Sequence, residues 1–436
     1  MPKLFQPHPE PALQRHWSVM QWAVLLMPIN TLVGCVTILV TAIAVWKNHA
    51  NRLVQSLVNQ ALLLLGCWMV IIAFFAENNG AAFGGLFNFL PFFVVFIAQS
   101  WLIQRPAQLR RLAWLMILPS VLVVLLGVGQ LFLKWYFHWK FLSIDGSSGI
   151  LLDWMIAKGG EPQGRMASLF YYATVLASYF VTTLTLTLGL WVDQWKTKRS
   201  PMMLGILGAI AAVNFVGLFL THSRNAWALA LAVIVAFATY IGWRWVGAVV
   251  MWVIIAVLEA AYAPPPLSSW FRRIVPRVIW ARINDEMFDR PVASLRTTQW
   301  QFAWNMVKER PLTGWGLRNF SALYQDQTQF FVGHPHNLPL MLSAEMGVPA
   351  TLLFYGLIGW IIYAGVMWVR QTRDRGDRAM MFTYIVAFLA CSLFSLFDVT
   401  FFDARINTMQ WLILACIWGV AQAGVVPDRD TSTPCD

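Results

Sequence analysis

Two histidines separated by one residue, His334 and His336, lie in a polar stretch from Ala263 to about Gly347 that interrupts an otherwise apolar chain. A histidine is a natural general base near neutral pH, because its unperturbed pKa of about 6.5 leaves the ring able to accept a proton. Asn337 follows and is placed to orient His336 or a sugar hydroxyl. Two alternatives stay open. The histidines are ordinary polar groups at a helix start, or the His-x-His pair binds a metal ion, for which the nearby sequence offers no third ligand.

Three arginines beside apolar segments are the second feature that points to chemistry. A charged side chain near a membrane span costs a few kcal/mol, so a binding partner is expected. The guanidinium group is a rigid fork of donors that suits phosphate, and several on one membrane face would hold a lipid diphosphate. Snorkelling to lipid headgroups is the alternative for each arginine alone. The three are Arg165, Arg224 and Arg296. Three acidic residues on the same face are further ligands or counter-ions: Glu345, Asp398 and Asp403.

The composition indicates that these residues are positioned by membrane helices. Hydrophobic residues make up 58% of the chain, charged residues 12%, and the mean hydropathy is +0.60. These values are typical of an all-α polytopic membrane protein. The sequence has no Walker loop, no Rossmann glycine pattern and no paired Asp motif for a metal-bound nucleotide sugar. An enzyme of this kind would therefore use an activated donor other than a nucleotide. No nucleic acid is expected as a partner.

Apolar windows of about 20 residues and the distribution of Lys and Arg in short loops predict the topology. Spans are expected at residues 54–76, 86–104, 112–134, 167–193, 201–221, 227–242, 246–262, 348–370, 379–397 and 404–425. Residues 17–46, with Pro28 and Asn30 near the middle, are expected to form a tight hairpin of two spans, or else one tilted span. The total is about twelve, with both termini inside. Residues 1–262 then form an N-terminal bundle of about nine spans. Residues 263–347 form a large outer loop, and residues 348–436 form three further spans and a cytoplasmic tail.

The large outer loop is predicted to be helical. Residues 267–283 alternate apolar side chains with arginines, which suits a helix in the headgroup layer that Pro276 interrupts. The arginines Arg272, Arg273 and Arg277 of this helix are placed to attract the phosphates of a lipid substrate. Residues 295–307 have helical spacing of Trp300 and its apolar neighbours, and Arg310-Pro311 ends that helix.

Several motifs in order resemble those of the O-antigen ligase and polymerase superfamily. They are Thr-His-Ser-Arg-Asn-Ala-Trp at 221–227, Arg296 with Trp300, Pro-Leu-Thr-Gly-Trp-Gly at 311–316, His-Pro-His-Asn at 334–337 and Glu-Met-Gly at 345–347. The resemblance runs from about Arg165 to the end of the chain. Residues 166–172 depart from the Gly-, Asn- and Pro-rich segment that follows the equivalent arginine in many relatives.

The resemblance implies a glycosyltransferase of GT-C-like architecture in the bacterial inner membrane, with its active site on the periplasmic face and with no cofactor or metal. It implies that a glycan passes from undecaprenyl diphosphate to a sugar hydroxyl of lipid A-core with inversion. His336 would be the catalytic base and Arg224 a diphosphate ligand. His334, Asn337, Glu345, Arg296, Arg165 and Asp398 complete the expected substrate site, with Asp398 preferred to Asp403. A polymerase, a protein O-oligosaccharyltransferase and a transporter or flippase of polyanionic lipid remain as alternatives.

Overall fold

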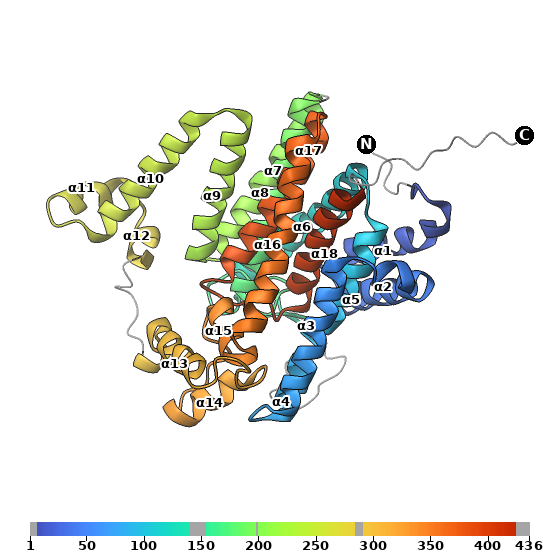
Figure 1. Cartoon of the computed structure of the whole chain (residues 1–436). Helices are drawn as coiled ribbons and strands as arrows, with labels where there is room; N and C mark the ends of the chain where they lie inside the picture. Colours follow the sequence, from blue (N-terminus) through green and yellow to red (C-terminus); the bar gives the residue numbers. More distant parts are fainter. Residues whose placement is uncertain (1–6, 140–153, 198, 284–290, 424–436) are drawn as a thin grey trace, which may run out of the picture.

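The computed structural model describes residues 7–139, 154–197, 199–283 and 291–423, and these are almost entirely helical (Figure 1). The helices of the first half are η1 (Pro11–Leu13), α1 (Gln14–Leu26), α2 (Thr31–Leu53), α3 (Leu57–Phe74), α4 (Asn79–Leu86), α5 (Leu90–Leu102), α6 (Pro106–Phe132), α7 (Ala173–Lys196) and α8 (Pro201–Leu220). Those of the second half are α9 (Arg224–Ile241), α10 (Arg244–Tyr262), α11 (Leu267–Ile274), α12 (Arg277–Ile283), η2 (Val292–Ser294), α13 (Arg296–Glu309), α14 (Asn319–Thr328), α15 (Leu338–Met346), α16 (Val348–Gln371), α17 (Arg375–Phe394) and α18 (Ala404–Ala423). A short antiparallel pair, β1 (Phe137–Trp139) and β2 (Trp154–Ile156), lies between α6 and α7.

Eleven helical segments of the described chain are long and apolar enough to cross a membrane, with α4 and α5 counted as one segment. This agrees with the predicted all-α polytopic architecture of about twelve spans, and the segment for which two arrangements were left open is residues 17–46. These residues do form a helical hairpin, in which the Asn30 side chain accepts a hydrogen bond from Val33 N (3.1 Å) and so caps α2. However, α1 has only 13 residues. At 1.5 Å per residue it is about 20 Å long, less than the hydrocarbon thickness of about 30 Å.

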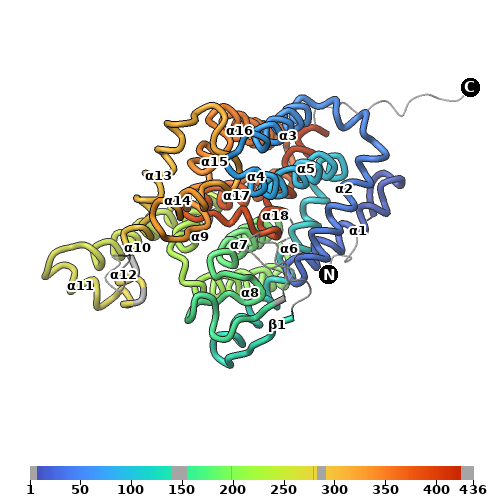
Figure 2. The backbone as a smooth tube through the Cα atoms, turned by 90° about the horizontal axis from the view of Figure 1, so that it is seen from below, coloured from blue at the N-terminus to red at the C-terminus, as the bar shows by residue number. Residues whose placement is uncertain are grey.

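The two most buried spans, α7 and α18, form the centre of the bundle (Figure 2). Helix α7 packs against α6, α8, α9 and α17, and α18 packs against α5, α16 and α17. Polar side chains inside the bundle bond to one another. Thr183 donates to Asn214 Oδ1 (2.7 Å), and Asn214 Nδ2 donates to Ser120 Oγ (2.9 Å), which joins α7, α8 and α6. Such interhelical hydrogen bonds stabilise packing where lipid supplies no hydrophobic driving force. The tail after residue 423 lies outside the described residues.

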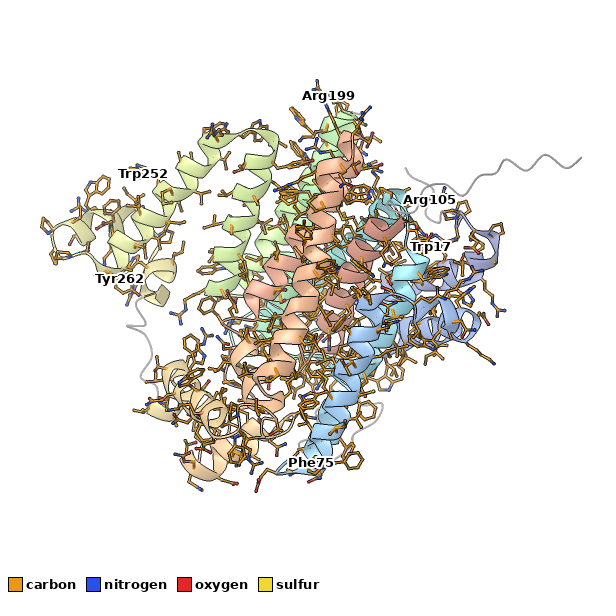
Figure 3. All side chains as sticks on the ribbon, in the orientation of Figure 1. Trp17, Phe75, Arg105, Arg199, Trp252 and Tyr262 are labelled. Atoms are coloured by element: carbon orange, nitrogen blue, oxygen red, sulfur yellow. The ribbon has the colours of Figure 1, made fainter. Side chains whose placement is uncertain are left out.

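The two ends of the helix bundle differ: arginines lie toward one end, and the helices α13, α14 and α15 lie at the other. Figure 3 shows Arg105 and Arg199 toward the upper end and Phe75 at the lower end. The helices α13, α14 and α15 also lie at the lower end, beside α4 (Figure 1). They share a small core of their own that includes Ala303, Phe320 and Tyr324. Backbone and side-chain hydrogen bonds fix this group to the corner between α3 and α4, from Glu77 N to Trp315 O (3.2 Å) and from Asn78 N to Asn319 Oδ1 (2.8 Å).

The turn between α13 and α14 fits closely against α15. Trp315 N donates to Ala344 O (3.0 Å), and Gly316 N donates to Glu345 O (2.8 Å). Gly314 has φ +69°, and a Cβ atom there would lie 2.5 Å from backbone atoms of Glu345. Only glycine combines this left-handed conformation with so close an approach. The turn therefore fixes α13, and with it Arg296, relative to α15.

Helices α10, α11 and α12 form a limb beside the bundle (Figure 1). Residues 267–283, for which a helix interrupted at Pro276 was predicted, form the two helices α11 and α12 with the break at Pro276. The predicted helix at 295–307 corresponds to α13. The limb has a separate apolar cluster built on Ala256, Ala260 and Val275. It is joined to the rest of the bundle chiefly through the packing of α10 on α9.

Candidate functional site

His336 and Asp398 form the centre of the site. The His336 Nδ1 atom lies 3.2 Å from Asp398 Oδ1, and the two side chains are 30% and 12% exposed. Burial alone would raise the pKa of Asp398. The hydrogen bond with His336 and the nearby His334 and Arg296 outweigh it, so the pKa lies below its usual value. Asp398 is thus ionised at neutral pH and accepts a hydrogen bond from the protonated Nδ1 atom of His336, which leaves the ring's lone pair on Nε2.

The backbone around His336 is held against the end of α17. Leu338 N donates to Ser395 O (2.9 Å). Asn337 Oδ1 accepts from Leu340 N (2.9 Å), and Asn337 Nδ2 donates to Leu396 O (3.2 Å). Asn337 is therefore the N-cap of α15 and a tie to the turn after α17. The orientation of His336, which the sequence analysis expected from Asn337, is provided by Asp398.

His334 packs beside His336 with 4.5 Å between the ring centroids. Its Nδ1 atom accepts a hydrogen bond from His336 N (3.2 Å). Burial, followed by the neighbouring His336, lowers the pKa of His334 to about 4, so its ring is neutral at physiological pH. The tautomer with the proton on Nε2 then offers a hydrogen-bond donor to a substrate oxygen.

The metal alternative gains a third group from the structure. One ligand atom each from His334, His336 and Asp398 lies within 4.8 Å of the other two. The nearby sequence offers no such ligand, because Asp398 comes from the turn between α17 and α18. The Nδ1 atoms of both histidines already take part in hydrogen bonds within this group. A bound ion would therefore have to displace a bond or use Nε2.

Arg296, the first residue of α13, is brought close to this group. Its positive charge contributes to the lowered pKa of both Asp398 and His334. Helix α13 is attached to the histidine segment by Trp300, whose Nε1 atom donates to Pro335 O (2.8 Å). The side chain of Arg296 is exposed, so it can reach a ligand above the histidines.

Arg224 is the first residue of α9, and the hydroxyl of Ser223 caps the helix by accepting from Ala226 N (3.4 Å). The next residue, Asn225, donates from Nδ2 to Phe394 O at the end of α17 (2.9 Å). The start of α9 is thus attached to the same turn that carries Asp398. Dipole and exposed N–H groups make a helix start favourable for an anion, and Arg224 adds a full positive charge there.

Arg165 lies on the other side of the turn before α9. Its Nε atom donates to Thr221 O (2.8 Å), and Met166 N donates to Leu220 O (2.9 Å). Arg165 therefore contacts the segment 221–223, and Arg224 follows that segment directly. The hydrogen bond to Thr221 gives Arg165 a role in holding this turn.

Glu345 lies at the far end of α15 from the histidines. Its carboxylate accepts from Phe320 N (3.3 Å) at the start of α14. The side chain is buried, and burial raises its pKa to about 7. The backbone N–H groups of Arg318 and Phe320 partly oppose this rise, because they stabilise the charged carboxylate. The structure does not bring Glu345 into the histidine and aspartate group. Its contacts join α14 to α15.

Asp403 is held by a residue that the sequence analysis did not select. Arg405 Nη2 lies 3.0 Å from Asp403 Oδ2, and its Nη1 atom donates to Leu169 O (2.8 Å). The guanidinium also lies over the Phe170 ring, 3.9 Å from its centroid. Of the two acidic residues near the last turn, Asp398 thus contacts His336 and Asp403 contacts Arg405. A charged residue at the start of an apolar span was the available signal for Arg405.

Part of the chain that carries this site matches a known protein family. Residues 207–355 match a family model described as O-antigen ligase. Residues 207–355 are therefore similar to the O-antigen ligase and polymerase superfamily. Members of this family are membrane enzymes that transfer glycans. The matched segment includes Arg224, Arg296 and His336, whereas Asp398 lies beyond it. No curated protein matches the chain.

Proposed function

We propose that the protein is an O-antigen ligase. It transfers a glycan from undecaprenyl diphosphate to a sugar hydroxyl of lipid A-core, on the periplasmic face of the bacterial inner membrane. The hydrogen bond between His336 and Asp398 carries the proposal, because it leaves His336 Nε2 able to accept a proton beside Arg296. Residues 1–262 and 348–436 then serve as the membrane bundle, and residues 263–347 as the periplasmic loop.

The proposed reaction is a single displacement. The acceptor hydroxyl oxygen attacks the anomeric carbon of the donor glycan while His336 Nε2 takes the hydroxyl proton. The bond between the anomeric carbon and the phosphate oxygen breaks, and undecaprenyl diphosphate leaves with the electron pair. Asp398 stabilises the imidazolium that forms. Attack from the side opposite the leaving group inverts the anomeric configuration.

The arginines stabilise the leaving group in this proposal. A diphosphate is already a good leaving group, so fixed guanidinium groups can replace a metal ion. Arg224 at the start of α9 and Arg296 at the start of α13 are the diphosphate ligands. Arg165 supports the turn on which Arg224 lies, through its bond to Thr221 O. The neutral His334 donates from Nε2 to an oxygen of the substrate.

A purified enzyme assay tests the proposal. Wild type and His336→Ala are incubated in nanodiscs with lipid-linked glycan as the donor, with a chelator and without nucleotide. The acceptor is lipid A-core, a second lipid-linked glycan, or a peptide that contains Ser and Thr. We expect core-linked product from the wild type only. His138→Ala is a matched control, since His138 lies in the β1 strand, and it should retain activity.

Each other result points elsewhere. Product in which glycan is joined to glycan would assign the protein as a polymerase, and product on a Ser- or Thr-containing peptide as a protein O-oligosaccharyltransferase. Movement of lipid across the bilayer without transfer would indicate a flippase. Equal activity of His336→Ala would remove His336 as the base, and loss of activity with the chelator would restore the metal alternative.

A further inference from the structure

The limb formed by α10, α11 and α12 carries a strongly basic surface that the proposed reaction does not use. Residues 263–283 contain four arginines and no acidic residue. Arg272, Arg273 and Arg277 are exposed. Arg272 is fixed in place, because its Nε atom donates to Ala260 O (2.8 Å) and its guanidinium lies 4.1 Å from the centroid of the Trp280 ring.

Helix α11 has a buried face, an exposed apolar face and an exposed face with arginines. Ser268 and Val275 are buried, and Phe271 packs with the apolar cluster on α10. Leu267, Trp270 and Ile274 lie on an adjoining face and are 47%, 51% and 60% exposed. Exposed apolar side chains next to exposed arginines are typical of a helix in the headgroup layer. Figure 3 shows Trp252 and Tyr262 on the same limb, beside the bundle.

The length of α10 supports this placement. Its 19 residues span about 28 Å at 1.5 Å per residue, close to the hydrocarbon thickness of a bilayer. With Arg244 at one membrane surface, Tyr262 and the following α11 reach the other. The arginines of α11 and α12 then lie at the same membrane surface as the segment that begins with Arg296.

We infer that this surface is a docking site for the phosphate groups of the acceptor, a glycolipid that carries more than one phosphate. The inference rests on the proposed function, since it identifies how the acceptor lipid is bound. Guanidinium groups match phosphate oxygens in pairs of hydrogen bonds. Several on one rigid surface favour a ligand with several phosphates in one molecule, because the second contact forms at high effective concentration. A phospholipid with a single phosphate lacks this advantage.

Lipid binding by the full-length protein in nanodiscs tests the inference without requiring transfer. The ligands are lipid A-core, the same lipid after phosphatase treatment, and phosphatidylglycerol. The variants are Arg273→Gln with Arg277→Gln, and the charge-preserving pair Arg273→Lys with Arg277→Lys. Arg199→Gln removes an exposed arginine at the opposite end of the bundle and is the matched control. Thermal melts check that each variant is folded.

We expect the Gln pair to weaken binding of lipid A-core by about 3- to 30-fold, as for two exposed ionic contacts. Binding of the dephosphorylated lipid should not change. The Lys pair should recover part of the lost affinity. The control Arg199→Gln should bind lipid A-core as tightly as the wild type does. Equal binding of phosphorylated and dephosphorylated lipid A-core by the wild type would overturn the inference. So would an equal loss of phosphatidylglycerol binding, which would indicate a general membrane anchor. A wild type that binds the phosphorylated lipid here but transfers no glycan would refute only the proposed function.

Discussion

Replacing Asp398 by Asn should abolish most of the transfer activity while leaving the fold intact. Asn has nearly the same size, so the packing of the turn after α17 is kept. The negative charge that holds the Nδ1 proton of His336 is lost. An amide can also donate to Nδ1 through its NH₂ group, which would place the ring proton on Nε2 and remove the acceptor of the substrate proton.

The structure gives the size of the effect. With 3.2 Å between Nδ1 and Oδ1, the centres of charge of an imidazolium and a carboxylate are about 4 Å apart, and at an effective dielectric constant near 20 they attract by about 4 kcal/mol. That energy corresponds to about a 10³-fold rate effect. The His336 side chain is 30% exposed and Asp398 is 12% exposed, so solvent screens part of it. We expect kcat to fall by about 10²- to 10³-fold, with the KM for the lipid-linked donor little changed.

The assay is steady-state transfer by wild type, Asp398→Asn and Asp403→Asn, with thermal melts of each. Asp403 is the control because it pairs with the buried Arg405 at 3.0 Å, which ties α18 to Leu169. Its replacement should lower the melting temperature, because a largely buried arginine loses its partner. The reasoning would be refuted if Asp398→Asn kept more than about a third of the wild-type kcat. A selective loss of kcat in folded Asp403→Asn would assign the catalytic role to the other acid.

Three further predictions concern the same region. Glu345→Gln should retain activity and melt at a higher temperature than wild type at pH 8. The pKa of Glu345 is about 7 in the folded protein and about 4.5 in the unfolded chain. The contribution of Glu345 to the free energy of unfolding is therefore full below about pH 4.5 and is lost as pH rises through 7, by up to about 3 kcal/mol. A difference in melting temperature between Glu345→Gln and wild type that does not depend on pH would contradict this. Arg224→Gln should lower kcat by about 10²-fold, and Arg224→Lys should recover part of it as a point charge without the fork; a wild-type rate of Arg224→Gln in single-turnover assays would exclude a leaving-group role. Gly314→Ala should destabilise the protein by about 1–3 kcal/mol, measured by chemical denaturation, because φ is +69° and the new Cβ would meet the Glu345 backbone; an unchanged midpoint would show that the turn adapts.

The spans were predictable because one physical variable, the length of an apolar run, decides them. The exception is α1, where Trp17, Met20 and Val24 are fully buried although the helix is too short to cross the bilayer alone. Hydropathy measures only that these side chains avoid water. It does not distinguish burial against α2 and α6 from contact with lipid. The break at Pro28 to Asn30 was visible, but the depth that α1 reaches was not.

The sequence singled out His336, Asp398 and Arg296, which the structure brings together, but it did not show how the acidic residues pair. His336 and Asp398 are 62 positions apart, and Asp398 and Asp403 both follow α17. The choice between them depends on how the turn is folded, which no local pattern encodes. The role of Asn337 was more accessible. An Asn directly before a helix with Pro339 in its first turn is a helix-start signal, and this signal indicates a cap rather than an orienting group for His336.

The residues from Phe394 to Asp398 connect the two halves of the proposed chemistry. Asn225 donates to Phe394 O from the helix that begins with Arg224. Leu338 N donates to Ser395 O from the helix that follows His336. Asp398 itself bonds to His336. The proposed base and the proposed leaving-group ligand therefore share one support of five residues, although α9 and α15 are separated in the chain by residues 242–337. A shift of this turn would therefore displace the segments that carry His336 and Arg224 together.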